Sequence, residues 1–308
     1  MGKIIIFYKY VDIKYPKQVL KWLQKICTDL GLKGRIILAH EGINATLAGE
    51  SEHIDLYKNI MNKHPLFDQI DFKEDAGNAE YFPRLRIVVK EEIVRLGVSP
   101  TKVTAREAGK HLTPDQAHAL FTNKPDNLVI LDARNNFESR IGKFTDAIIP
   151  DIERFRDLPE YLEKNIELFK NKQVVMYCTA GIRCERASAY LKEKGVAQEV
   201  YQMEGGIQRY VEKYPDGFFR GKNYVFDARV SVKVNDDVLS NCLRCKKPCD
   251  DYTNCLNAKC NEHFICCSAC NEQFESTCSS NCFELLSAGK TTLRPAFKKA
   301  DIKSCSLQ

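Results

Sequence analysis

The chain has 308 residues, of which 44% are hydrophobic and 28% charged, a composition typical of globular proteins and not of disordered or fibrous ones. Its net charge of +5 is spread evenly without a basic tail, so charge alone does not indicate a nucleic-acid partner. No apolar run reaches the roughly 18 residues that span a membrane, and the run Ile4–Phe7 is too short for a signal peptide. We therefore expect a cytoplasmic protein with no membrane partner.

Residues 1–97 alternate between strand and helix patterns. Apolar runs predict strands at 3–11, 35–39, 44–48 and 85–90. Apolar residues at helical spacing predict helices at 15–30 and 51–62. The resulting order, βαββαβ, predicts a ferredoxin-like (acylphosphatase-like) domain in which two helices cover one sheet.

Residues 98–112 are polar and contain turn formers, so we expect a connector there. Residues 113–225 then show short apolar runs of the parallel-strand type at 128–131, 173–177 and 200–201. Helical patterns lie at 113–120, 158–169 and 185–194. This alternation predicts a parallel α/β domain with crossover helices.

Residues 226–308 form a third segment, which opens on a predicted strand at 224–234 and is then rich in cysteine. Ten of the 14 cysteines lie between Cys242 and Cys282, while Cys305 lies alone near the end. In a cytosolic chain, so local a cluster is more often a metal site than a set of disulfides. Beyond Cys282 we expect a weakly helical tail.

Two CxxC pairs, Cys242/Cys245 and Cys267/Cys270, have the spacing of a tetrahedral thiolate site, because a two-residue gap lets a tight turn present both sulfurs. We expect a structural zinc ion that helps this core-poor segment to fold, with disulfides, free thiols or an iron–sulfur cluster as alternatives. A second candidate site lies among six further cysteines: Cys249, Cys255, Cys260, Cys266, Cys278 and Cys282.

The sharpest chemical signal is the segment Cys178–Arg183, between a predicted strand and a predicted helix. Ligands of open α/β sheets bind beyond the carboxyl ends of the strands. The N–H groups at a helix start favour an anion, so we expect a stabilised thiolate or persulfide at Cys178. Arg183 would supply a positive charge for an anionic substrate or intermediate. The alternative is a buried structural cysteine, with Gly181 as an ordinary turn residue.

Several other residues allow two interpretations. Cys184 is either a resolving thiol or a small buried helix residue. His40 and Glu41 could form an acid–base pair, but a strand-to-strand turn favours a hydrogen-bonded corner, and Asn44 is likewise a turn former. The segment Tyr81–Arg86 mixes aromatic and basic residues and is either an RNA-stacking edge or, as we favour, a loop with exposed arginines.

At this point the sequence resembles a known class of domain. Cys178–Arg183 and the following Glu185–Ser188 resemble the active loop and helix of rhodanese domains. Leu131–Arg134 resembles their structural strand end, and Gly205–Ile207 resembles their late glycine turn. The six-residue loop is similar to that of the sulfurtransferase branch, whereas the phosphatase branch has a longer loop.

Further motifs extend the resemblance over the whole chain. Together with His40–Thr46, Ile182–Ser188, Pro215–Phe219 and the cysteine-rich tail, the chain resembles the oxygen-dependent tRNA uridine hydroxylases. The resemblance implies an oxidoreductase that acts in tRNA modification by 5-hydroxylation of the wobble uridine. It further implies tRNA as partner, molecular oxygen as co-substrate and Cys178 as the essential residue.

The chemistry of oxygen activation is not evident from the residues. The chain has no Gly-rich dinucleotide fingerprint and no obvious triad of two histidines and a carboxylate, so we find no flavin or nicotinamide signature. We hypothesise that Cys178, or its persulfide, adds to uridine C6 and makes C5 electron-rich. The alternative function is sulfur transfer from thiosulfate or another sulfane-sulfur donor through a Cys178 persulfide. A third is a zinc-dependent interaction module without activity.

Overall fold

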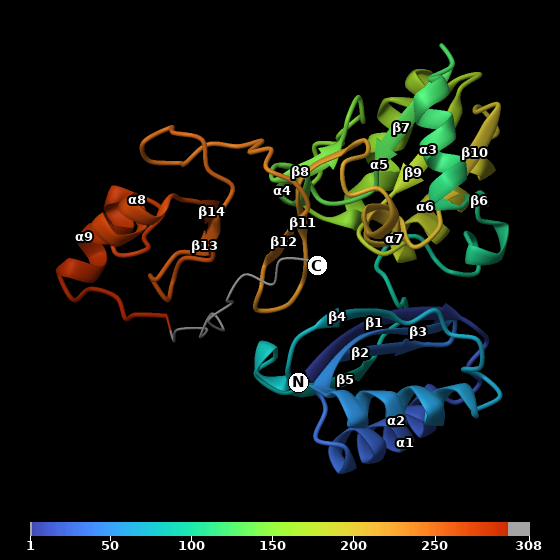
Figure 1. Cartoon of the computed structure of the whole chain (residues 1–308), viewed down its shortest axis with the longest axis horizontal. Coiled ribbons are helices and arrows are strands. Elements are labelled where there is room, and N and C mark those ends of the chain that lie inside the picture. The colour runs from blue at the N-terminus through green and yellow to red at the C-terminus, as the bar shows by residue number, and fades with distance from the viewer. Residues whose placement is uncertain (1, 295–308) are drawn as a thin grey trace. The chain divides into compact units, whose positions relative to one another are not determined.

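A computed structural model of the chain describes residues 2–294, so the predicted lone cysteine Cys305 lies outside the described residues. The described chain divides into two compact units (Figure 1). The first unit contains residues 2–136 and 146–218, and the second contains residues 137–145 and 219–294. No helix among the described residues is both long and apolar enough to cross a membrane.

The N-terminal part of the first unit is a five-stranded sheet in the order β4-β1-β3-β2-β5, with both of its helices on one face (Figure 1). Its elements are β1 (Gly2–Tyr10), α1 (Pro16–Asp29), β2 (Lys33–Ala39), β3 (Gly42–Glu50), α2 (Ser51–Asn62), β4 (Lys73–Ala76), the 3-10 turn η1 (Ala79–Tyr81) and β5 (Leu85–Val89). Alternate strand residues such as Ile5, Phe7 and Ile36 are fully buried against Leu23 and Tyr57 of the helices. The ferredoxin-like prediction is confirmed.

One strand of that prediction has a different place. The strand that completes the βαββαβ order is β4, which pairs antiparallel with β1 at the sheet edge. The predicted strand at 85–90 is β5, an additional strand parallel to β2. β4 reads Lys-Glu-Asp-Ala, which lacks an apolar run because an edge strand needs little burial.

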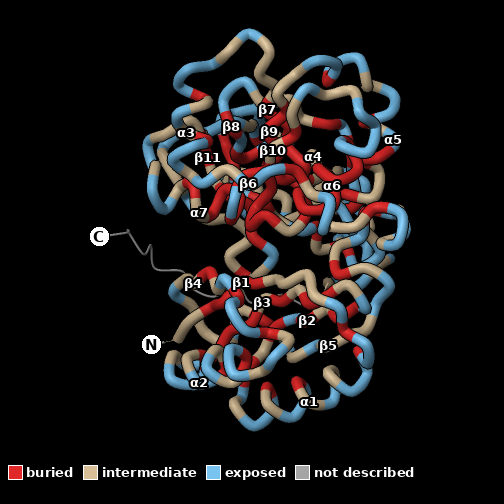
Figure 2. The backbone as a smooth tube through the Cα atoms, turned by 90° about the vertical axis from the view of Figure 1, so that its right-hand side faces the viewer, coloured by how far each residue is buried: buried red, intermediate tan, exposed pale blue. Residues whose placement is uncertain are grey.

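The second part of this unit is a four-stranded parallel sheet in the order β6-β10-β9-β7, which confirms the predicted α/β class. Its strands are β6 (Lys110–Leu112), β7 (Leu128–Asp132), β9 (Gln173–Tyr177) and β10 (Glu199–Met203). Its helices are α3 (Pro114–Asn123), α5 (Leu158–Lys164), α6 (Ile182–Glu193) and α7 (Gly206–Lys213), with 3-10 turns η2 (Ala105–Glu107), η3 (Phe155–Asp157) and η4 (Ile166–Phe169). The short helix α4 (Asn136–Ser139) belongs, apart from its first residue, to the second unit. Figure 2 shows the middle strands of this sheet as largely buried.

Some boundaries differ from those predicted. β6 lies inside the expected connector, where three residues are too few for a periodic signal. Helix α6 begins at Ile182, three residues before the predicted start, so the cysteine loop runs directly into it. The helix predicted at 158–169 is broken into α5 and η4 at Asn165.

A buried ion pair stabilises the ends of two neighbouring strands of the parallel sheet. Arg134 and Asp132 have no exposed surface, and the guanidinium donates to the carboxylate through Nε at 2.9 Å and Nη2 at 2.7 Å. The hydroxyl of Tyr177 donates to the same carboxylate at 2.8 Å. Because Asp132 ends β7 and Tyr177 ends β9, this contact fixes the two strand ends beside the cysteine loop.

The second unit holds the cysteine-rich segment. Its elements are β8 (Gly142–Phe144), β11 (Phe219–Tyr224), β12 (Ser231–Lys233), β13 (Tyr252–Asn254), β14 (His263–Ile265), α8 (Ser268–Gln273) and α9 (Ser280–Ser287). The single strand predicted at 224–234 is wrong, because the chain reverses there and Tyr224 pairs with Ser231. The reversal is held by the ion pair of Arg229 with Asp227 and by a left-handed Val230 (φ 64°). Of the predicted helical tail beyond Cys282, the part up to Ser287 is helical in α9, residues 288–294 are not helical, and the rest lies outside the described residues.

Candidate functional site

The predicted cysteine loop lies between the end of β9 and the start of α6. Cys178 is fully buried, and its sulfur accepts a hydrogen bond from the backbone N–H of Gly181 at 3.1 Å. Gly181 caps the helix at a φ of +102°, a conformation that favours glycine. The local sequence therefore wraps backbone donors around the sulfur, as the motif predicts.

The surroundings of Cys178 stabilise its thiolate. Burial raises the pKa of the thiol, but three kinds of interaction outweigh it and lower the pKa to about 5. These are a hydrogen bond from Cys184, the charge of Arg183, and the backbone N–H groups of Arg183 and Ala180. The Arg183 guanidinium is itself buried and donates to Thr179 Oγ1 at 3.2 Å, which keeps it over the loop. Cys178 is therefore an anionic sulfur at neutral pH.

Helix α7 closes the other side of the loop, at the predicted late glycine turn. The N–H of Ile207 donates to the carbonyl of Cys178 at 2.9 Å, and that of Gln208 donates to the carbonyl of Thr179 at 3.1 Å. A Cβ on Gly206 would lie 2.3 Å from the Cys178 carbonyl oxygen. Only glycine permits so close an approach, so the glycine turn and the cysteine loop form one packed unit.

The N-terminal sheet also reaches this loop. The hydroxyl of Tyr8, on β1, lies 2.8 Å from where a Cβ on Gly181 would stand. It donates to the carboxylate of Glu185 at 3.0 Å. The neighbouring Tyr10 donates to the carbonyl of Ile182 at 3.4 Å. Burial and the Glu185 charge raise the pKa of Tyr8, so a neutral phenol stands beside the cysteine loop.

Glu185, in the first turn of α6, is the centre of a polar network. Besides Tyr8, its Oε1 contacts His111 Nε2 at 3.0 Å, and its Oε2 accepts from Gln202 at 2.9 Å. Gln202 also donates to the carbonyl of Gly109 at 3.1 Å. The hydrogen bond to Glu185 raises the pKa of His111, whose side chain is 48% exposed. Through Glu185, hydrogen bonds therefore connect the partly exposed His111 to the phenol of Tyr8 beside the cysteine loop.

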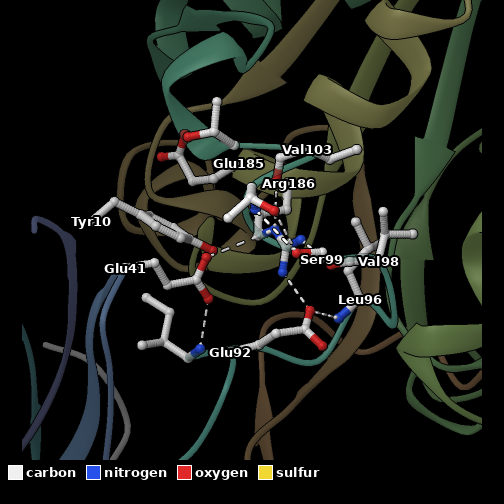
Figure 3. Close-up of polar contacts among 12 residues, drawn as sticks. Tyr10, Glu41, Glu92, Leu96, Val98, Ser99, Val103, Glu185 and Arg186 are labelled. Atoms are coloured by element: carbon white, nitrogen blue, oxygen red, sulfur yellow. Dashed lines mark hydrogen bonds and ion pairs between the residues drawn. The ribbon is translucent and has the colours of Figure 1, made fainter. Parts of the chain in front are cut away.

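Arg186 follows Glu185 and holds the two sheets of this unit together (Figure 3). Its side chain is fully buried, forms an ion pair with Glu92 and lies 3.9 Å from a carboxylate oxygen of Glu41. It also donates to the carbonyls of Val98 and Val103. A buried charge with this many partners fixes α6, and therefore the cysteine loop, against the segment that follows the N-terminal sheet.

The turn between β2 and β3 is a hydrogen-bonded corner, as its position favours. Glu41 accepts from the backbone N–H of Ile93 at 2.8 Å, and burial raises its pKa. His40 instead contacts the carbonyl of Ile13 at 3.0 Å. Asn44 donates to the carbonyl of Ile93 at 3.0 Å. The side chains of His40 and Glu41 therefore form hydrogen bonds to different partners and do not form the acid–base pair that the sequence allowed.

The segment Tyr81–Arg86 fits the second of its two interpretations. Phe82 is buried and Tyr81 half-buried, and both pack against Ile4 of the sheet. Their rings are therefore not free to stack on bases. Arg84 and Arg86 are exposed.

Sequence reasoning found Cys178, Arg183 and Cys184 but missed Tyr8, His111 and Gln202. Tyr8 and His111 lie on strands 177 and 74 residues away from Glu185, and Gln202 lies 17 residues away on the strand that follows α6. The one available signal for Tyr8 was its alternation with the buried Phe7, which places it on the other face of β1.

The cysteine-rich segment gathers eight thiols into two groups of four. In each group the sulfurs all lie within 4.8 Å of one another: Cys242, Cys245, Cys267 and Cys270 in one, and Cys255, Cys260, Cys278 and Cys282 in the other. The first group is the predicted pair of CxxC motifs. The pairs alternate between the two groups along the chain, so each group ties together two distant segments.

The sulfur spacing suits a tetrahedral metal ion. Cys245 and Cys267 lie 3.7 Å apart, and Cys260 and Cys278 lie 3.6 Å apart. Four ligands at the usual zinc–sulfur distance of about 2.3 Å would be roughly 3.8 Å from one another. The side-chain amide of Asn257 donates to Cys282 at 3.4 Å, the kind of contact that orients a metal-bound thiolate. Both groups could therefore hold a metal ion.

Two of the six cysteines predicted for a second site belong to neither group. Cys249 and Cys266 are both buried, and Cys266 lies 4.0 Å from Cys242. Both cysteines pack in the small hydrophobic core of the second unit. His263 stacks on Tyr252 with ring centres 4.3 Å apart, so it is also outside both groups.

Comparison with known proteins assigns each part of the chain to a family. Residues 2–93 match the UPF0176 acylphosphatase like domain, residues 113–213 the rhodanese-like domain and residues 220–283 the rhodanase C-terminal domain. The chain is 40% identical over 286 residues to the tRNA uridine(34) hydroxylase of Cytophaga hutchinsonii, with 91% of this chain and 89% of that protein covered. It is 39% identical over 286 residues to that of Corynebacterium jeikeium, with 90% and 92% covered.

Solved structures are similar to part of the chain. A rhodanese-related protein of Thermoplasma volcanium matches 34% of this chain and 92% of its own, with 23% identity and a TM-score of 0.27. A rhodanese-like domain protein of Staphylococcus aureus matches 33% and 90%, with 22% identity and a TM-score of 0.27.

The hydrogen bond from Cys184 generates a prediction about the reactivity of Cys178. The rate at which iodoacetamide alkylates the peptide containing Cys178 should rise with pH through a midpoint near 5 in the wild-type chain. In Cys184→Ala the midpoint should move to higher pH because a donor to the thiolate is lost, whereas Cys184→Ser, which keeps a donor, should move it less. Peptide mass spectrometry measures both; an unchanged midpoint in Cys184→Ala would contradict the account.

Proposed function

The chain belongs to the tRNA uridine(34) hydroxylase family, and we propose that it hydroxylates C5 of uridine 34 in tRNA with Cys178 as the nucleophile. The observation that carries the proposal is the buried sulfur of Cys178, which accepts the backbone N–H of Gly181 at the start of α6 in surroundings that lower its pKa. A cytoplasmic location, where tRNA is found, and molecular oxygen as co-substrate are parts of the same proposal.

In this mechanism the sulfur of Cys178 adds to C6 of the uracil ring. The S–C6 bond forms while the C5–C6 π pair moves into the C4 carbonyl, so that C5 gains the electron density of an enolate. C5 then adds molecular oxygen, and a two-electron donor such as a dithiol supplies two electrons and two protons: the O–O bond breaks, one oxygen atom stays on C5 as a hydroxyl group and the other leaves as water. Loss of the C5 proton and departure of the thiolate restore the C5–C6 double bond and the free enzyme.

Arg183 and the helix start have a supporting role in this proposal. The addition step moves negative charge from sulfur to the O4 of the ring, and a fixed positive charge nearby lowers the cost of that movement. Arg183 is buried beside the loop and already acts on the Cys178 charge. The neutral Tyr8 stands at the same loop as a hydrogen-bonding group for the ring.

A second candidate function is sulfur transfer through a Cys178 persulfide. It is favoured by one observation, the six-residue loop from Cys178 to Arg183 with donors that would stabilise a persulfide as well as a thiolate. Release of thiocyanate from thiosulfate and cyanide would reveal such an activity, and it requires no tRNA.

The proposed hydroxylation is tested by the nucleosides at the wobble position of tRNA. In a strain without the endogenous enzymes, wild-type chain should restore 5-hydroxyuridine, and Cys178→Ala should reduce it at least about a hundredfold because the nucleophile is lost. Liquid chromatography with mass spectrometry measures the product. Wild-type levels in Cys178→Ala would refute the proposed role of this residue, and no 5-hydroxyuridine with the wild-type chain would refute the function.

We also propose that both thiolate groups bind zinc and stabilise the second unit. Metal analysis of reduced, untagged chain should give about two zinc ions, and Cys245→Ser or Cys260→Ser should each reduce this to about one. Cys249→Ser is the matched control, because Cys249 is a buried cysteine outside both groups, and should keep two. Less than about 0.2 zinc per chain would contradict the proposal.

A further inference from the structure

One face of the N-terminal sheet is not covered by its helices. On each strand the residues that alternate with the core residues point to this open face; Ile36, for example, is fully buried, and its neighbour Arg35 is exposed. Ile6, Thr46, Arg35 and Arg86 are paired in register across β1, β3, β2 and β5. They therefore form one row across the open face, and it ends in two arginines.

The two arginines lie side by side without an acidic partner. Arg35 and Arg86 are Cα partners on parallel strands, both are exposed, and neither has an ion pair among residues 2–294. Like charges directly opposite each other on a sheet are unfavourable. Lys3 and Lys9 of β1, by contrast, pair with Asp55 and Asp68, each at 2.8 Å. Partial desolvation and the charge of Arg86 lower the pKa of Arg35. The pair is thus complementary to an anion.

The same face of the sheet leads from this pair toward the cysteine loop, and the segment after β5 contacts it at Asn44, which donates to the carbonyl of Ile93 at 3.0 Å. The next row consists of Tyr8, Asn44, Ile37 and Val88, again paired in register across the same four strands. Ile37 and Val88 are half-buried, so an accessible apolar surface adjoins the arginines. The row ends at Tyr8, whose hydroxyl stands beside Gly181. At about 4.8 Å between strands, β2 and β5 are roughly 10 and 14 Å from β1, a distance of a few nucleotides.

We propose that Arg35 and Arg86 bind backbone phosphates of a single-stranded tRNA segment, whose bases lie over the open face toward the Cys178 loop. This inference rests on the proposed function, since it assumes that the substrate is tRNA. Guanidinium groups pair bidentately with phosphate, and half-buried apolar side chains accept the faces of unstacked bases. The segment with this chemistry next to uridine 34 is the anticodon loop.

The experiment measures binding, not turnover. Fluorescence anisotropy with a synthetic anticodon stem-loop RNA containing uridine 34 is recorded over a series of KCl concentrations for the full chain. Arg35→Gln/Arg86→Gln should weaken binding about tenfold and reduce the slope of log K against log salt by about 1.4, at roughly 0.7 per lost phosphate contact. Lys17→Gln/Lys21→Gln is the matched control, because it removes the same charge from α1 on the other face, and should change neither value appreciably.

Further variants separate binding from folding and from association. Arg35→Lys/Arg86→Lys keeps both charges and should retain most of the salt slope, which a merely misfolded sheet would not. Equal affinity and slope in the Gln variant and the α1 control would overturn the inference. So would a change of oligomeric state by light scattering with RNA binding intact, because the face would then bind protein.

The inference and the proposed function can fail separately. If the arginine variant binds RNA normally while the wild-type chain makes 5-hydroxyuridine in cells, the phosphate site alone is wrong. If RNA binding depends on the arginines but the wild-type chain makes no 5-hydroxyuridine, the site stands and the reaction is wrong.

Discussion

A guanidinium without exposed surface is the constraint on which the first unit depends. Arg186 can remain charged inside the protein only because Glu92, Glu41 and two backbone carbonyls surround it (Figure 3). Removing one partner of such a buried pair typically costs about 3–5 kcal/mol, so its parts stay together. Arg186 belongs to α6, while its partners come from the β2–β3 turn and the segment after β5. The pair therefore joins the N-terminal sheet to the helix that begins at the cysteine loop.

The other residues in the first turns of α6 interact either with Cys178 or with the N-terminal sheet. Arg183 and Cys184 act on Cys178 and lower the pKa of its thiol, whereas Glu185 receives the hydroxyl of Tyr8 from β1. Four consecutive residues thus connect the reactive sulfur to a second sheet. The N-terminal domain thus supplies the phenol of Tyr8 that lies beside the rhodanese-type loop.

Local signals made much of this predictable. The strand, the cysteine, the glycine, the arginine and the helix are contiguous, so the loop at Cys178 could be placed from the sequence. Tyr8 and His111 could not, because only the packing of distant strands brings them to Glu185. The spacing of the CxxC pairs identified the first group of four cysteines, but not the second, because Cys249 and Cys266 belong to neither group and spacing does not distinguish them from the other four candidates. β4 was missed because a polar edge strand of four residues has no pattern to recognise.

The most direct test of the account is covalent trapping on RNA. Fluorine at C5 cannot leave as a proton does, so a thiolate that adds to C6 of 5-fluorouridine should remain attached once C5 has reacted. The full chain, incubated aerobically with an anticodon stem-loop RNA carrying 5-fluorouridine at position 34, should give a covalent protein–RNA species that resists denaturation and that mass spectrometry identifies as protein plus RNA plus the group added at C5. Cys178→Ala should give none, whereas Cys184→Ala should still form it. No adduct with the wild-type chain, or an adduct that persists in Cys178→Ala, would contradict nucleophilic attack by Cys178.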